Sequence, residues 1–153
     1  NFTMLELFSN SAEDTINVGK KIGSSLTKGT VIAFKGTLAA GKTTLTKGIA
    51  ESLEIDEVIT SPTFTLVSEY EGKLPLYHFD VYRLDSVEDF LNIGSEEMMY
   101  GDGVCAIEWS EKIESALPKE AIIIDIEILT PETRKITIKN WPYDKNIFSE
   151  YIK

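Results

Sequence analysis

The run that decides the fold of this chain is Gly36-Thr37-Leu38-Ala39-Ala40-Gly41-Lys42-Thr43. It has the form G-x-x-x-x-G-K-[ST], which chance should produce in well under ~1% of chains of this length. Residues 30–34 before it form a short β-rich run, and residues 44–53 after it carry apolar side chains at helical spacing. This order of strand, glycine-rich loop and helix places bound phosphates at a helix N-terminus.

The loop supplies the groups that hold the phosphates of a nucleotide. The backbone N–H groups expected to point at the β-phosphate belong to Leu38, Ala39, Ala40, Gly41, Lys42 and Thr43. Lys42 is expected to reach the β/γ oxygens and the Thr43 hydroxyl to ligate Mg²⁺. The alternative is a glycine turn that merely precedes a helix, and the register of Lys42 with Gly36 and Gly41 disfavours it.

Two carboxylates are candidates for holding the metal or the attacking water. Phosphoryl transfer needs such a group, typically at the carboxyl end of a neighbouring strand. Glu108 follows the wholly apolar run 104–107, and Asp80 follows the β-like run 76–79. We predict catalytic roles for both, and a metal site built from both together with Thr43. The alternative for each is an ordinary strand-terminal acid that faces solvent.

Three other residues allow two interpretations each. Thr63 lies where NTPases often place a hydroxyl that senses the γ-phosphate, but it can also be the first residue of a strand after Pro62. Trp109, beside Glu108, is typical of packing material as well as of a nucleotide site. His78, the single histidine, lies between aromatic residues, which favours a structural strand position over a catalytic base.

Composition limits the classes of protein that need be considered. The chain has 153 residues, enough for one core, so we predict a single domain over residues 1–153. A formal charge of -10 disfavours direct nucleic-acid binding. The single cysteine, Cys105, excludes an intramolecular disulfide and fits a reducing cytoplasm. No apolar run approaches the ~20 residues of a membrane helix, and no signal sequence is visible, so we expect a cytoplasmic protein without membrane association.

The remaining segments complete an α/β pattern. We predict a helix over 11–26, a hairpin of 63–70 and 74–82, a helical stretch over 87–99 divided at Gly94-Ser95, a buried strand over 104–107, a short helix over 110–117, strands over 121–129 and 134–139, and a last amphipathic turn over 144–152. The predicted fold is a P-loop NTPase-like domain. It has a mostly parallel central sheet flanked by helices, with an antiparallel hairpin extension.

Four segments together resemble one family. They are the loop extended to Thr44, Ser61-Pro62-Thr63-Phe64-Thr65-Leu66-Val67 with Glu69-Tyr70, His78-Phe79-Asp80-Val81-Tyr82-Arg83-Leu84, and Ile107-Glu108-Trp109-Ser110-Glu111-Lys112. In this order and spacing the chain resembles the TsaE-type ATPases of bacterial tRNA threonylcarbamoyladenosine synthesis. The loop alone identifies only a superfamily, whereas the other three segments make the resemblance specific.

The resemblance implies a weak Mg²⁺-dependent ATPase that works with the TsaB and TsaD proteins. ATP hydrolysis would support repeated threonylcarbamoyl transfer to adenosine in the tRNA anticodon loop, and the acidic chain would reach tRNA only through its partners. By the same resemblance, residues near the nucleotide include Thr44, Trp109, Ser11 and Arg134, the last two at the adenine end. The family usually has Asp and Gly where this chain has Thr37 and Ala39, and Ala39 cannot adopt a positive φ without strain.

Two other functions stay open at this point. A nucleotide-dependent binding switch would use ATP to order the segment 61–73, with hydrolysis incidental. A small-molecule kinase is the second alternative. It usually clamps two phosphate groups with several guanidinium groups, and this chain has only two arginines, Arg83 and Arg134.

Overall fold

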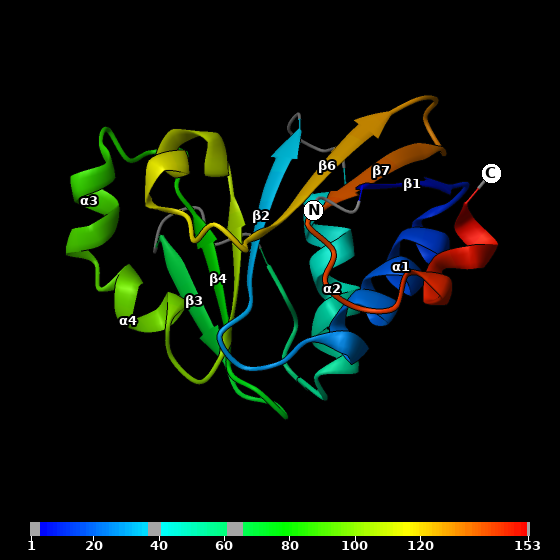
Figure 1. Cartoon of the computed structure of the whole chain (residues 1–153). Helices are drawn as coiled ribbons and strands as arrows, with labels where there is room; N and C mark the ends of the chain where they lie inside the picture. The colour runs from blue at the N-terminus through cyan, green and yellow to red at the C-terminus, as the bar shows by residue number, and fades with distance from the viewer. Residues whose placement is uncertain (1–3, 37–40, 61–65, 153) are drawn as a thin grey trace.

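The strand that leads into the glycine-rich loop, β2 (Val31–Gly36), lies at the centre of a seven-stranded sheet. The computed structural model describes residues 4–36, 41–60 and 66–152. The strand order is β1-β7-β6-β2-β5-β4-β3 (Figure 1). The other strands are β1 (Met4–Ser9), β3 (Val67–Tyr70), β4 (Leu76–Asp80), β5 (Val104–Glu108), β6 (Ile122–Ile128) and β7 (Arg134–Lys139).

The sheet is parallel at its centre and antiparallel at both edges. β2 runs parallel to β5 and β6, and β4 runs parallel to β5. β3 pairs antiparallel with β4, which confirms the predicted hairpin for the part that is described. At the other edge, β7 pairs antiparallel with both β6 and β1. The predicted α/β class is therefore confirmed, with a parallel region confined to the four central strands.

Helices cover both faces of the sheet. α1 (Ala12–Ser25) and α2 (Lys42–Ser52) pack together on one face, where α2 buries Leu45 and Ile49 against Ile32. α3 (Val87–Asn92), α4 (Ser95–Met99) and the 3₁₀ helix η1 (Ser110–Ala116) lie on the other face. Among the described residues, none of the helices has the length and apolar character needed to cross a membrane.

Single residues with capping side chains or a left-handed backbone determine where the two helices near the site begin. The Ser11 side chain caps α1 by accepting the backbone N–H of Asp14 at 3.0 Å. Gly41 precedes α2 at φ +116°, a left-handed conformation that glycine adopts without strain. Sequence periodicity predicts a helix over 44–53, and α2 begins two residues earlier, at Lys42. This position puts Lys42 in the first turn of the helix.

One strand lies outside the prediction, and the predicted last turn is present. β1 was not expected, although its alternation of exposed Met4 and Glu6 with buried Leu5 and Leu7 is a strand pattern. The strand is short, and it is stabilised by pairing with β7, which is far away in sequence. The predicted last turn is confirmed as the 3₁₀ helix η2 (Lys145–Tyr151), which buries Phe148 in the core.

Cys105 should be unreactive in the folded protein. Its side chain is fully buried in β5, and burial raises the pKa of its thiol to about 12. At pH 8 only about one thiol in 10⁴ would be ionised, and the thiolate is the reactive form. We expect no measurable reaction of the native protein with Ellman's reagent, and one equivalent per chain after unfolding in guanidinium. Rapid reaction of the native protein would contradict this burial, and a Cys105→Ser variant gives the background signal.

Candidate phosphate-binding site

The glycine-rich loop connects the centre of the sheet to the N-terminus of α2. Gly36 ends β2, and Gly41 and Lys42 begin the helix. Some predictions concern residues that the structure does not describe. They are the phosphate contacts of Leu38, Ala39 and Ala40, the differences from the family at Thr37 and Ala39, and the role of Thr63. Thr43 and Thr44 are half-buried in the first turn of α2. A phosphate bound here would meet the free N–H groups of that turn.

Lys42 is the most informative side chain of the site. It is only 4% exposed, and its ammonium has no hydrogen-bond partner among the described residues. The Nζ atom lies 4.3 Å from the centroid of the Trp109 ring. A cation over an indole face is stabilised by the ring quadrupole, but the ring supplies no oxygen acceptor for the three N–H groups of the ammonium. As far as the described residues show, these groups are available to the oxygens of an anion.

Asp80 and Glu108 lie side by side near the N-terminus of α2. They occupy paired positions at the carboxyl ends of the parallel strands β4 and β5. Glu108 shares a sheet face with Ala106, two residues earlier, which belongs to the core under α2. Both acids are buried, Glu108 at 6% and Asp80 at 9% exposure, so neither is an ordinary solvent-facing acid. Asp80 Oδ1 accepts the backbone N–H of Tyr82 at 3.0 Å.

The two acids and the Thr43 hydroxyl make a donor set suited to Mg²⁺. The described residues contain no cluster of three or more His, Cys, Asp or Glu side chains able to hold a metal alone. Mg²⁺ commonly needs only one or two carboxylates, because it keeps several waters and takes its other ligands from phosphate oxygens. The set therefore fits a metal that arrives with a nucleotide better than a permanent metal centre.

His78 lies within strand β4, as its sequence neighbours favour, and it also contacts a candidate catalytic residue. Its Nε2 lies 2.6 Å from Glu108 Oε2, and the imidazole is fully buried. The histidine shares a face of β4 with Asp80, two residues later, which is the signal that could have identified it from the sequence.

Trp109 packs against the core cluster on one face of the sheet and also contacts Lys42. Its backbone is left-handed, with φ +64°, in the turn between the end of β5 and the start of η1. The ring contacts Tyr82 with centroids 4.7 Å apart, besides its contact with the Lys42 ammonium. The Ser110 hydroxyl fixes the turn by donating to the Phe34 carbonyl of β2 at 3.0 Å. Trp109 thus connects the first turn of α2 to the segments that carry both acids.

A cavity of about 320 Å³ brings together the two residues predicted at the adenine end. Its lining includes Ser11, Gly41, Thr44, Arg134, Asn10 and Glu132. Gly41 and Thr44 line this cavity and also belong to the end of the glycine-rich loop and the first turn of α2. Ser11 and Arg134 also have structural tasks, because Ser11 caps α1 and the Arg134 guanidinium donates to carbonyls of the β6–β7 turn. Sequence reasoning missed Asn10 and Glu132, which carry no motif.

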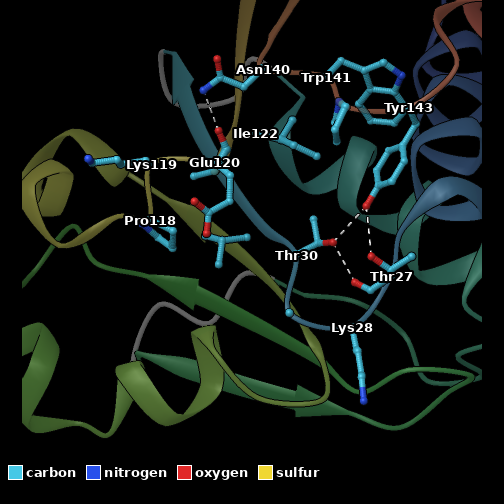
Figure 2. A pocket seen from close by; sticks show the side chains of 14 residues that line it. Thr27, Lys28, Thr30, Pro118, Lys119, Glu120, Ile122, Asn140, Trp141 and Tyr143 are labelled. Atoms are coloured by element: carbon cyan, nitrogen blue, oxygen red, sulfur yellow. Dashed lines mark hydrogen bonds between the residues drawn. The ribbon is translucent and has the colours of Figure 1, made fainter. Parts of the chain in front are cut away.

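A larger hollow, of about 470 Å³, lies at the opposite end of β2. Its polar groups bond to one another: the Tyr143 hydroxyl contacts those of Thr27 and Thr30, and the Asn140 amide donates to the Ala121 carbonyl. Figure 2 shows the Lys28 and Lys119 side chains pointing away from this network. The hollow lacks the orphaned charge that marks Lys42, so we assign the candidate site to the loop end of the sheet.

Comparison with known proteins places this chain in a family. Residues 9–136 match the family model described as threonylcarbamoyl adenosine biosynthesis protein TsaE. The tRNA threonylcarbamoyladenosine biosynthesis protein TsaE of Treponema pallidum is 51% identical over 130 residues, which are 85% of this chain and 96% of that protein. Its Bacillus subtilis counterpart is 43% identical, over 82% and 78% of the two chains.

A solved structure gives the same result. The crystal structure of Bacillus subtilis YdiB superposes with a TM-score of 0.79 at 35% identity, covering 98% of this chain and 92% of that one. Sequence and fold agree, and the resemblance to this family is confirmed. The chain belongs to the TsaE family of tRNA threonylcarbamoyladenosine biosynthesis proteins.

Proposed function

We propose that this protein binds ATP with Mg²⁺ and hydrolyses it slowly, in support of the TsaB and TsaD proteins during threonylcarbamoyl modification of tRNA. The observation that carries the proposal is the buried Lys42 ammonium at the start of α2, for which the described part of the chain offers no hydrogen-bond partner. Two buried carboxylates at the ends of adjacent strands complete the set that phosphoryl transfer requires.

In this proposal some residues bind the nucleotide and others serve hydrolysis. Lys42 and the N–H groups of the first turn of α2 would hold the phosphates, with Thr43 and the two acids placed for the metal. Bound Mg²⁺ would neutralise charge that develops on the phosphates. Glu108 and Asp80 would keep the metal or the attacking water in line. Ser11 and Arg134 line the cavity that would take the adenine end.

The charge of the chain supports action through protein partners. A net charge of -10 opposes direct contact with the tRNA backbone and favours surfaces of opposite charge on other proteins. We therefore propose that TsaB and TsaD supply most of the tRNA contact. A strong, salt-sensitive tRNA affinity of the isolated chain would contradict this division of labour.

Glu108→Gln should separate nucleotide binding from hydrolysis. The substitution keeps the size of the side chain and removes its charge, so we expect ATP affinity to stay within about threefold while hydrolysis falls roughly 10²-fold or more. Phosphate release with Mg²⁺, alone and with TsaB and TsaD, measures the loss. Glu111→Gln, an exposed neighbour with the same change of charge, is the matched control.

The same variant distinguishes the switch from the ATPase. Repeated cycles of tRNA modification by a variant that binds ATP without hydrolysing it would favour the nucleotide-dependent switch. Phosphorylation of an added small-molecule acceptor would favour a kinase. If TsaB and TsaD fail to change the hydrolysis rate of the wild-type chain, the partner-coupled role is wrong even if ATP binds.

A further inference from the structure

A buried hydrogen bond joins the only histidine of the chain to a candidate catalytic carboxylate. His78 Nε2 and Glu108 Oε2 are 2.6 Å apart, across the two adjacent parallel strands β4 and β5. His78 has no exposed surface, and its other ring nitrogen, Nδ1, has no hydrogen-bond partner among the described residues. A short buried contact of this kind restrains both side chains, because the enclosed imidazole has no access to a water that could replace the carboxylate.

The register of the two strands shows how the hydrogen bond between His78 and Glu108 is oriented. Asp80 pairs with Glu108, and His78 pairs with Ala106, two positions further from the loop end of the sheet. The bond therefore runs diagonally across the two strands, and it orients the Glu108 carboxylate away from the loop end of the sheet. A carboxylate has two acceptor oxygens, so a bond at Oε2 leaves Oε1 for a water or a metal.

The surroundings of the ring indicate which nitrogen carries the proton. When Glu108 is a carboxylate it can only accept, and the nitrogen that faces it is then the donor. The unpartnered Nδ1 is then a bare acceptor, which is less costly to bury than an N–H without a partner. In a neutral imidazole the hydrogen bond of one nitrogen sets the tautomer, and here it assigns the proton to Nε2.

We propose that His78 is a positioning residue that holds the Glu108 carboxylate in its working orientation. This role rests on the proposed function, because it matters only if Glu108 serves the metal or the attacking water. Groups that orient such a ligand typically affect activity or metal affinity by about 10–100-fold when they are removed. His78 itself is too deeply buried to reach a nucleotide.

Two substitutions at this position separate positioning from packing. His78→Phe keeps an aromatic ring of similar size and removes the N–H, whereas His78→Gln places an amide N–H near the position of Nε2. We expect kcat for ATP hydrolysis to fall about 10–100-fold in the Phe variant, with ATP affinity within about twofold. The Gln variant should recover most of the rate. Equal losses in both variants, or no loss in either, would overturn the proposal.

Nuclear magnetic resonance tests the contact without relying on hydrolysis. Because the chain has a single histidine, ¹⁵N labelling gives one set of ring signals. In the nucleotide-free wild-type protein we expect the proton on Nε2 to be protected from exchange with water. In Glu108→Ala we expect the same proton to exchange. A wild-type ring that is protonated on Nδ1, or whose Nε2 proton is indifferent to Glu108→Ala, would contradict the assignment. This measurement stands even if His78→Phe does not fold.

A third readout keeps the two proposals apart. If the wild-type chain shows no hydrolysis with or without its partners, the ATPase proposal fails, and the effect of Mg²⁺ on nucleotide affinity then decides the role of His78. A smaller Mg²⁺ effect in His78→Phe, restored in His78→Gln, would still support positioning of Glu108. An unchanged Mg²⁺ effect in both variants would exclude it.

Discussion

Lys42→Ala should nearly abolish ATP hydrolysis, by roughly 10²–10³-fold, which is the usual effect of removing one preorganised charge-stabilising group. The lysine is the only described cation of the first turn of α2, and its buried ammonium lies over the ring of Trp109, the residue after Glu108. Its loss removes the charge that would meet the β/γ oxygens, where phosphoryl transfer develops negative charge. Phosphate release under saturating Mg²⁺ and ATP measures the effect, and isothermal titration calorimetry gives the accompanying loss of affinity.

The same substitution should leave the fold intact or stabilise it. The wild-type ammonium is buried and finds no hydrogen-bond partner within the residues that the structure describes, and such burial costs free energy in the absence of a ligand. Lys47→Ala is the matched control, because it removes the same charge from an exposed position on the same helix. Equal loss of hydrolysis in both variants would indicate a general effect of charge, and full activity of Lys42→Ala would exclude the site.

Local sequence patterns predicted most of the elements. The apolar run 104–107 indicates a strand buried on both faces, and β5 is such a strand. Gly94-Ser95 indicates a break, and α3 and α4 meet there. These predictions succeed because each depends on side-chain periodicity or on the backbone freedom of one residue. The same reasoning placed Asp80 and Glu108 at strand ends before their pairing was known.

The contacts that sequence reasoning missed depend on the register between strands. His78 and Glu108 are 30 residues apart, and no local pattern states that their side chains meet. The left-handed backbone of Trp109 is equally hidden, because glycine and not tryptophan usually signals such a turn. β1 has a strand pattern, but its stability comes from β7 at the far end of the chain. Contributions of Thr63 and of residues 37–40 stay predictions.

The close contact of α1 with α2 is what places the capping end of α1 beside the phosphate loop. Gly19 and Gly48 face each other, and a Cβ atom added to Gly48 would lie 2.1 Å from the Ile16 carbonyl oxygen and 2.9 Å from Gly19 Cα. Both obstacles are backbone, so a change of rotamer cannot relieve them. The two helices lie side by side in Figure 1, and their N-terminal ends supply Ser11 and Gly41 to the same cavity.

Gly48→Ala should therefore destabilise the protein, by about 3 kcal/mol, the upper range for overpacking a core, even though alanine is the better helix former by ~1 kcal/mol. In a domain of this size the change corresponds to a fall in Tm of roughly 6–12 °C. Differential scanning calorimetry measures it, with Lys47→Ala, the exposed neighbour, expected within about 0.5 kcal/mol of wild type. Because separation of the helices would also widen the cavity, ATP affinity should fall with stability. A wild-type Tm in Gly48→Ala would mean that the helix contact does not hold the site together.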